Sequence, residues 1–226
     1  MSKSNSIIVH VICEGQTEEA FVKELLVEPF AQKGIYLMPA LIGRPGHKGG
    51  NFKFDRLYPD VEKRLLADRH CYCTTFFDFY GLPESFPGKN ALDRKAEVAV
   101  KAQALHGELI EKLKEKVGDD AMRRFIPYVQ MYEFEALLFS DPQKMAQGMD
   151  LEHLATSFAD IANSFATPEE INNSPQTASS KRIESLVPGY EKPLLGTLAA
   201  LEVGLKTMRE KCQLFDAWLT KLEALA

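Results

Sequence analysis

An uninterrupted apolar run near the N-terminus constrains the fold more than any other feature of the sequence. Residues 8–13 read IVHVIC, without the apolar–polar alternation of a strand that has one wet face. Such a strand is buried on both faces, which is typical of a parallel sheet covered by helices. Glu14 and Gly15 follow at once. Because ligands of open parallel sheets bind beyond the carboxyl ends of the strands, Glu14 is the first candidate for a functional residue.

The same pattern of a strand followed by an acid returns twice along the chain. Residues 70–77 are rich in β-branched and aromatic side chains, which predicts a second buried strand, and Asp78 follows directly. Residues 125–131 (FIPYVQM) are predicted as a further strand, with Glu133 and Glu135 just beyond it. Since the carboxyl ends of parallel strands meet at one edge of a sheet, we expect these acids to lie close together.

Helical periodicity fills most of the remaining chain. Thr17 begins a helix that ends near Pro29, and residues 35–42 are predicted as a strand. Pro39 places that strand at a sheet edge, because proline has no N–H to donate. Further helices are expected over residues 54–67, 94–117, 132–139, 151–165 and 195–212, with a polar, proline-rich connection over residues 167–193.

Strand–helix alternation therefore predicts an α/β fold with a parallel sheet and right-handed crossovers in the first part of the chain. No strand pattern is visible after residue 150, which predicts a helical C-terminal part. We place the α/β domain at residues 1–145 and the helical part, packed on it, at residues 146–226.

The composition excludes several classes of protein. With 226 residues, 45% of them hydrophobic and 26% charged, the chain can form a sizeable globular core. Its apolar runs fall short of the roughly 18 residues that a membrane-spanning helix needs, and residues 6–13 lack the features of a signal peptide. We therefore expect a cytoplasmic protein that does not bind membranes. Its cysteines lack paired spacing and are expected to be reduced and mostly buried.

The balance of charge bears on nucleic-acid binding. A net charge of −5 argues against a broad surface that coats nucleic acid, but allows a local basic groove or a basic partner subunit. Arg44, His47 and Lys48 share a glycine-rich loop without the Walker pattern, and are candidates for phosphate contacts. Lys181 could neutralise a phosphodiester in the transition state and Arg182 could bind phosphate, although a solvated basic turn explains both equally well.

The acids at the strand ends suggest a metal site. Hard divalent cations such as Mg²⁺ or Mn²⁺ prefer oxygen ligands, and a helix N-terminus next to them attracts phosphate. Glu14 and Glu18 are four residues apart, so a helix starting at Gly15 would turn them to one face. The alternative is that Glu18 only complements the helix dipole and that Asp78 is an ordinary turn residue. The predicted metal ligands are Glu14, Glu18, Asp78, Glu133 and Glu135.

Several of these motifs together resemble a known family. Glu14-Gly15 after the first strand and Asp78 after a later one look like the Toprim fold of topoisomerases, primases and OLD-family nucleases. The combination of EGQTEE, TTFFDFYGLP, YVQMYEFEALLF, SSKR and LFDAWLTKLE is similar to an uncharacterised bacterial Toprim-like domain-of-unknown-function family related to RloB. This resemblance covers nearly the whole chain. It implies a Toprim-like, Rossmann-like parallel sheet flanked by helices, with a helical C-terminal extension.

The resemblance also implies roles for individual residues. Glu14 corresponds to the Toprim glutamate, a metal ligand or general acid/base. Glu18 corresponds to the acid at the next turn in OLD-type nucleases, and Asp78 to the first aspartate of the Toprim Asp-x-Asp pair. Relatives occur beside ATPase genes in restriction and phage-defence loci, which implies a similar setting and an ATPase partner.

One position departs from the Toprim pattern. Tyr80 stands where the second aspartate is expected, which removes a usual metal ligand unless Glu133 or Glu135 supplies the oxygen. The leading interpretation is a Mg²⁺-dependent enzyme that cleaves phosphodiester bonds of DNA or RNA. The alternative is a non-catalytic Toprim-like binding or interaction subunit that has lost full nuclease chemistry.

Overall fold

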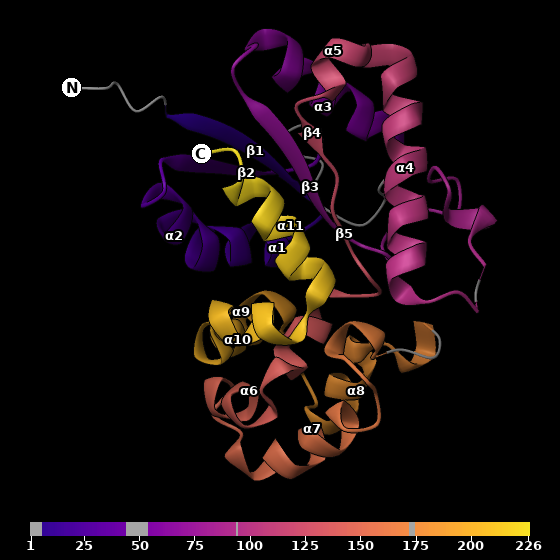
Figure 1. Ribbon diagram of the computed structural model, residues 1–226. Coiled ribbons are helices and arrows are strands. Elements are labelled where there is room, and N and C mark those ends of the chain that lie inside the picture. The colour runs from indigo at the N-terminus through magenta and orange to yellow at the C-terminus, as the bar shows by residue number, and fades with distance from the viewer. Residues whose placement is uncertain (1–5, 44–53, 94, 172–174) are drawn as a thin grey trace.

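The strands form one parallel α/β sheet, as the sequence predicts (Figure 1). The computed structural model describes residues 6–43, 54–93, 95–171 and 175–226. The strand order is β2-β1-β3-β4, and β5 also pairs with β3. Every pairing is parallel. The strands are β1 (Ile7–Cys13), β2 (Ile35–Leu41), β3 (Tyr72–Asp78), β4 (Phe125–Ile126) and β5 (Val129–Gln130).

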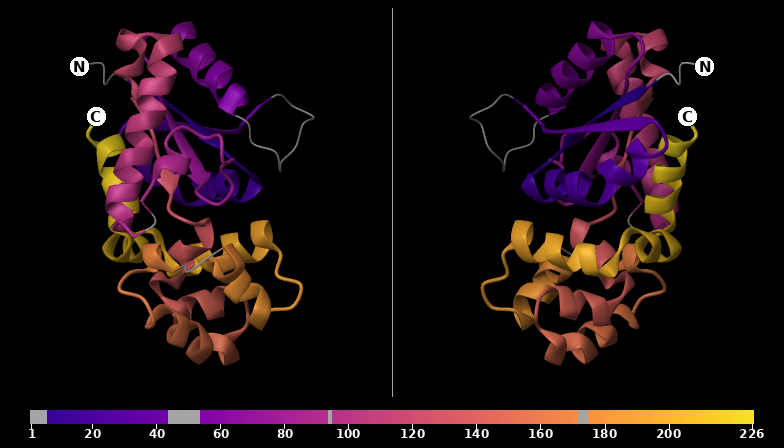
Figure 2. Two further views of the ribbon diagram at one scale, coloured as in Figure 1. Left: turned by 90° about the vertical axis from the view of Figure 1, so that its right-hand side faces the viewer. Right: turned by 90° about the vertical axis from the view of Figure 1, so that its left-hand side faces the viewer.

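Helices cover both faces of the sheet, so its central strands are buried on both sides (Figure 2). Val9, Val11 and Cys13 of β1 belong to one core and Ile12 to the other, because successive side chains point to opposite faces. The first core includes residues of α1 (Gln16–Phe21), the π-helical turn Val22–Leu26, α2 (Val27–Ala31) and α11 (Gln213–Glu223). The second includes residues of α3 (Phe54–Ala67), α4 (Val98–Val117) and α5 (Asp119–Met122).

The edge position of β2 is confirmed, but the single strand predicted over residues 125–131 is wrong. It is divided into β4 and β5 around Pro127, which cannot donate to a sheet ladder. The side chain of Thr75 replaces part of the missing pairing. Its Oγ1 donates to the Tyr128 carbonyl at 2.8 Å and accepts from the Tyr128 N–H at 2.9 Å. The chain therefore stays beside β3 and delivers the residues after β5 to the sheet edge.

The C-terminal part is helical, with more helices than the periodicity indicates. Residues 167–193, predicted as a connection, contain α8 (Ser179–Leu186), and the helix predicted over residues 195–212 is divided at Gly204, whose φ is +82°. The helix predicted from residue 94 begins at Val98 in α4. The other elements are the 3₁₀ helices Lys89–Ala91, Phe134–Ser140, Glu152–Leu154, Pro168–Glu170 and Pro175–Thr177, and α6 (Pro142–Gly148), α7 (Ala155–Ala162), α9 (Lys192–Val203) and α10 (Leu205–Lys211).

The helical part shares its core with the sheet through α11. Trp218 is buried, its ring stacks on Tyr128 at 4.3 Å, and its Nε1 donates to Thr74 Oγ1 at 2.8 Å. The remaining C-terminal helices lie below the carboxyl ends of the strands (Figure 1). In the described ranges, no helix is both long enough and apolar enough to cross a membrane.

The partly buried His106 of α4 makes the stability of this arrangement depend on pH. Its Nε2 accepts a hydrogen bond from the Val129 N–H at 3.1 Å, and burial, with a smaller contribution from Lys221, lowers its pKa from 6.5 to about 4. The unfolded chain binds a proton below pH 6.5, whereas the folded chain resists it until about pH 4. The stability that neutral His106 contributes is therefore lost as the pH falls through this window, by about 3 kcal/mol in total.

We expect urea unfolding at several pH values to reveal this loss as a difference between two proteins. Below pH 6.5 the wild-type free energy of unfolding should fall relative to that of His106→Gln, which cannot titrate. Both proteins share the other titrating groups, so these groups cancel when the pH dependence of the free energy of unfolding is compared between the two proteins. Parallel pH profiles for the two proteins would show that His106 titrates normally in the folded state.

Candidate functional site

The parallel pairing of β1 and β3 brings Glu14 and Asp78 together. The Glu14 N–H donates to the Phe76 carbonyl at 3.1 Å, continuing the ladder past the end of β1. The Glu14 side chain then reaches across to β3, where its Oε2 accepts from the Asp78 N–H at 2.9 Å. The strand ends thus place both acids at the carboxyl edge of the sheet.

A glycine makes room for the Glu14 carboxyl group. A Cβ added to Gly81 would lie 1.8 Å from Glu14 Oε1, far closer than atoms can approach. Gly81 was not among the residues predicted from the sequence. Gly81 lies three residues after Asp78 in FDFYGLP, and a glycine there could have been predicted to let another group approach the backbone closely.

Glu18 has two functions in the structure at once. It is 4% exposed, and its Oε2 accepts from the Gly15 N–H at 2.8 Å, so it caps the helix that begins at Gln16. Its charge also lies close enough to Glu14 to raise the pKa of that carboxyl. Glu18 therefore completes a helix N-terminus and adds a carboxylate to the strand-end acids.

Glu135 joins these acids from the 3₁₀ helix Phe134–Ser140, together with a lysine that the sequence analysis did not identify. Lys192 Nζ lies 2.9 Å from Glu135 Oε2 and 3.6 Å from Asp78 Oδ2, while Asp78 Oδ1 accepts from the Phe134 N–H at 2.8 Å. Lys192 opens α9 at the end of the segment predicted as a connection. We call Glu14, Glu18, Asp78 and Glu135 the acid cluster.

Buried oxygen atoms near Lys192 lack hydrogen bonds. Among the described residues, neither carboxylate oxygen of Glu135 nor the hydroxyl of Tyr190 has a hydrogen-bond partner. Lys192 Nζ lies 2.9 Å from Glu135 Oε2, so an ion pair holds this oxygen and, among the residues that the structure describes, Oε1 is the one without a charged partner at that distance. The Glu135 side chain is 0% exposed, so its oxygens are also shielded from bulk water. Unsatisfied buried carboxylate oxygens are costly, which makes them available to a cation or a proton donor.

The pKa values of the cluster reflect excess negative charge in a buried place. Burial, followed by the charge of Glu18, raises the pKa of Glu14 to about 7. Burial also raises the pKa of Glu135 to about 7 and that of Asp78 well above its ordinary value. Burial lowers the pKa of Lys192, but Asp78 and Glu135 more than offset this, so the ammonium stays charged. The carboxyl groups of the cluster outnumber the cations that act on them, which are Lys192 and, for Glu14, also Lys89, and protons near neutral pH make up part of the difference.

The donor chemistry of the acid cluster suits a hard divalent cation. The cluster offers carboxylate oxygens, two of them without hydrogen bonds, and competition between protons and a cation is expected at such oxygens. Within the described part of the chain, however, no three His, Cys, Asp or Glu side chains are already arranged as a group that could hold a metal ion. A cation would therefore require small side-chain movements, including displacement of the Lys192 ammonium.

The remaining predicted site residues lie outside the acid cluster. Glu133 caps α8: its Oε2 accepts from the Ser180 N–H at 2.8 Å, and Ser180 Oγ donates to its Oε1 at 2.9 Å. Lys181 is exposed and pairs with Glu184 at 2.6 Å along the same helix. Arg182 Nε donates to the Thr177 carbonyl at 2.8 Å. The candidates Arg44, His47 and Lys48 fall outside the described residues.

At the position of the second Toprim aspartate, Tyr80 packs with other aromatic rings. Its ring lies 5.6 Å from the ring of Tyr132 and 5.8 Å from that of Phe79. Of the two acids expected to replace the missing oxygen, the structure brings Glu135 to Asp78 and uses Glu133 as a helix cap.

Comparisons with known proteins place the chain in a family. Searches of curated proteins and of solved structures found no match. A family profile described as "Domain of unknown function (DUF4276)" matches residues 13–223, which include the acid cluster, Lys192 and nearly all of the helices and strands. The chain therefore belongs to this family of domains of unknown function.

Proposed function

We propose that this protein is a Toprim-like nuclease that uses Mg²⁺ or Mn²⁺ to cleave phosphodiester bonds. The observation that carries the proposal is the acid cluster at the carboxyl ends of β1 and β3, in which the buried Glu135 Oε1 has no hydrogen-bond partner among the described residues. A likeness to RloB and to the Toprim domains of OLD-family nucleases is part of this proposal and is supported by the same residues.

Glu14 and Asp78 are the proposed ligands of the cation, because one hydrogen bond already holds them together. Glu18 and Glu135 lie beside them and supply further oxygen. A bound divalent cation would polarise the phosphate, activate water and stabilise the leaving oxygen. The Glu14 carboxyl group is packed directly against Gly81, which fixes its position. This side chain therefore needs little movement to bind a cation.

Lys192 takes the role that the sequence analysis gave to Lys181. Its ammonium group lies against the acid cluster, whereas Lys181 is paired with Glu184 on the surface. In the proposed reaction Lys192 moves from Glu135 to a phosphate oxygen and neutralises charge that develops there. The N-terminus of α9, where Lys192 lies, also favours a phosphate at this place.

Two carboxyl groups are able to exchange protons at neutral pH. Glu14 and Glu135 each have a pKa raised to about 7, chiefly by burial. A general base works best when its pKa lies near the operating pH. Whichever of the two is not neutralised by the cation can accept the proton of the attacking water.

A second candidate function has its own supporting observation. The Lys192 ammonium already pairs with Asp78 and Glu135, and Tyr80 replaces the second Toprim aspartate. Both features suit a non-catalytic subunit in which lysine serves as a permanent counterion. Such a subunit would bind a phosphate-bearing ligand or a partner ATPase without cutting nucleic acid.

The direct test is cleavage of labelled single- and double-stranded DNA and RNA by the purified chain. We expect cutting with Mg²⁺ or Mn²⁺ and none with EDTA. Cleavage that persists in EDTA would contradict the metal requirement. No cleavage with either metal, together with saturable binding of a phosphate-bearing ligand, would favour the non-catalytic subunit.

The proposed setting is a restriction or phage-defence system with an ATPase partner, and it leads to a prediction about binding. Because the net charge is −5, the chain alone should bind DNA and RNA weakly. Lys181 and Arg182 are each engaged within the chain, which further limits the basic surface. Fluorescence anisotropy at physiological salt measures this. Tight, strongly salt-dependent binding by the isolated chain would contradict the prediction and indicate a concentrated basic groove.

A further inference from the structure

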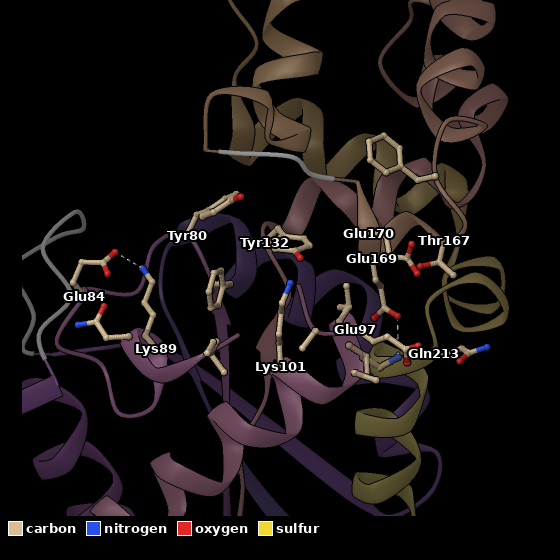
Figure 3. Close-up of a pocket in the computed structure, with 18 residues that line it drawn as sticks. Tyr80, Glu84, Lys89, Glu97, Lys101, Tyr132, Thr167, Glu169, Glu170 and Gln213 are labelled. Carbon is tan, nitrogen blue, oxygen red and sulfur yellow. Dashed lines mark hydrogen bonds and ion pairs between the residues drawn. The ribbon is translucent and has the colours of Figure 1, made fainter. Parts of the chain in front are cut away.

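A cavity of about 1130 Å³ lies between the residues that follow β3 and the helical part (Figure 3). It is lined by residues that directly follow β3, by the start of α4, by residues in and near the 3₁₀ helix Pro168–Glu170, and by the first residues of α11. None of the acid-cluster residues lines it. The cavity is therefore distinct from the acid cluster, although Phe79 and Tyr80 in its lining directly follow Asp78.

An aromatic group forms one wall of this cavity. The rings of Tyr80 and Tyr132 lie 5.6 Å apart with 36° between their planes, and Phe79 meets Tyr132 edge-on at 6.0 Å. Figure 3 shows the two tyrosines next to each other on the same side of the cavity. Both tyrosines are only partly buried, so their rings offer surface to a ligand.

The backbone holds the two tyrosines in place. The Tyr80 N–H donates to the Tyr132 carbonyl at 3.1 Å, which ties the ends of β3 and β5 together beyond the sheet. Tyr132 has φ = +70°, in the left-handed region that side chains rarely adopt. Such strained residues gather at functional sites, where a required side-chain position outweighs the cost. The strain at Tyr132 thus supports a binding role for its ring.

Among the described residues, the charged side chains that line the cavity are four acids and two lysines, and this excess of acids favours a neutral, polar ligand group over a phosphate: Glu84, Glu97, Glu169, Glu170, Lys89 and Lys101. Lys89 pairs with Glu84 at 3.4 Å and lies 5.3 Å from the centre of the Phe79 ring. Glu97 and Glu170 line the cavity on the side away from Tyr80, and Figure 3 shows Glu169 and Glu170 together there. Carboxylates repel phosphate but accept hydrogen bonds from the amino groups of nucleobases.

We propose that this cavity binds the unpaired bases of a single-stranded nucleic acid, with Tyr80 and Tyr132 as the stacking surface. The proposal rests on the proposed nuclease function and names its substrate class. Asp78 and Tyr80 are two residues apart, at most about 7 Å along an extended chain. Tyr132 is likewise adjacent to the segment that carries Glu135. Bases stacked on the tyrosines would therefore leave their phosphodiester within reach of the acid cluster and Lys192.

The same geometry selects against duplex substrates. Paired bases expose their edges and hide their faces, whereas an unpaired base can place its face against an aromatic ring. The cavity slightly exceeds the range of about 300–1,000 Å³ that is usual for small-molecule sites. It therefore has room for a short stretch of unpaired nucleotides but not for a double helix.

The test measures binding in EDTA, so it does not depend on cleavage. A short single-stranded oligonucleotide that contains 2-aminopurine is titrated with the chain at low salt, and stacking is followed by quenching of its fluorescence. We expect saturable quenching with the wild type, the same quenching with Tyr80→Phe and Tyr132→Phe, and about ten-fold weaker binding with Tyr80→Leu and Tyr132→Leu. The same oligonucleotide in a duplex should quench far less.

Tyr36→Leu is the matched control, because Tyr36 is an exposed tyrosine on the edge strand β2. It should bind like the wild type, and thermal unfolding of every variant shows whether the fold is kept. Absence of saturable quenching with the wild type, or equal binding by the Leu and Phe variants, would overturn the proposal. Quenching without metal-dependent cleavage would leave the base site standing and refute the nuclease function. Equal metal-dependent cleavage of duplex and single strands by the wild type would refute the base site and leave the nuclease function standing.

Discussion

Glutamine in place of Glu14 is expected to abolish metal-dependent cleavage, by a factor of at least about 100. The substitution removes a negative charge from the acid cluster and a carboxyl group whose pKa of about 7 suits proton transfer. The glutamine amide oxygen can still accept from the Asp78 N–H, so the strand ends should remain paired. We expect the free energy of unfolding to change by less than about 1 kcal/mol. Cleavage rates with Mn²⁺ and urea unfolding measure the two effects separately.

Glu24→Gln is the matched control for this experiment. Glu24 is an exposed acid in the π-helical turn Val22–Leu26, away from the strand ends. Its replacement by glutamine removes the same charge as Glu14→Gln does. It should cut at the wild-type rate. If Glu14→Gln cuts as fast as Glu24→Gln, Glu14 is not part of the catalytic machinery and the nuclease proposal is wrong.

A second large effect is expected from Lys192→Met, and it should move metal affinity and cleavage in opposite directions. Removing the ammonium group eliminates a positive charge 2.9 Å from Glu135 Oε2 and 3.6 Å from Asp78 Oδ2. The affinity for Mn²⁺ should therefore rise by about ten-fold. Cleavage should slow by about 100-fold, because the charge that neutralises the phosphate is also lost. Calorimetry and initial rates at saturating Mn²⁺ measure the two quantities.

The stability of Lys192→Met should also depend on pH. Lys192 holds the pKa of Glu135 down, so removing it raises that pKa above the wild-type value of about 7. The folded variant then keeps a proton on Glu135 over a pH range in which the unfolded chain has released it, which costs stability as the pH rises. The variant should therefore lose more stability at pH 8 than at pH 6, and saturating Mn²⁺ should restore part of it. Lys181→Met is the control, because Lys181 pairs only with Glu184 on the surface. Unchanged Mn²⁺ affinity in Lys192→Met would show that lysine and cation do not compete for one site.

The parts of the site that depend on local sequence could be predicted. Apolar strands that end in acids predict that parallel pairing will bring the acids to one edge, and the structure places Glu14 beside Asp78 there. The parallel sheet and the edge position of β2 follow from the same kind of local pattern. The division of residues 125–131 was also visible in principle, because Pro127 cannot take part in a ladder.

The rest of the site depends on contacts between residues far apart in the chain. Helix α8 begins at Ser179, and its first turn is capped by Glu133, which accepts hydrogen bonds from Ser180. Glu133 lies more than forty residues before Ser180 in the sequence. Lys192 follows a polar stretch without periodicity, and its role becomes clear only when α9 meets the sheet edge. Gly81 is required only because Glu14 folds over it. Propensity and spacing carry no information about such partners, so these residues were missed.

Anomalous diffraction from crystals of the chain soaked with Mn²⁺ at pH 8 tests the central claim most directly. At this pH the carboxyl groups of Glu14 and Glu135, with pKa values near 7, have largely lost their protons. We predict an anomalous peak within about 2 Å of oxygen atoms of both Glu14 and Asp78, with the Lys192 ammonium displaced from Glu135. Saturating Mn²⁺ with no peak at these carboxylates, and Lys192 still paired with Glu135, would contradict the account.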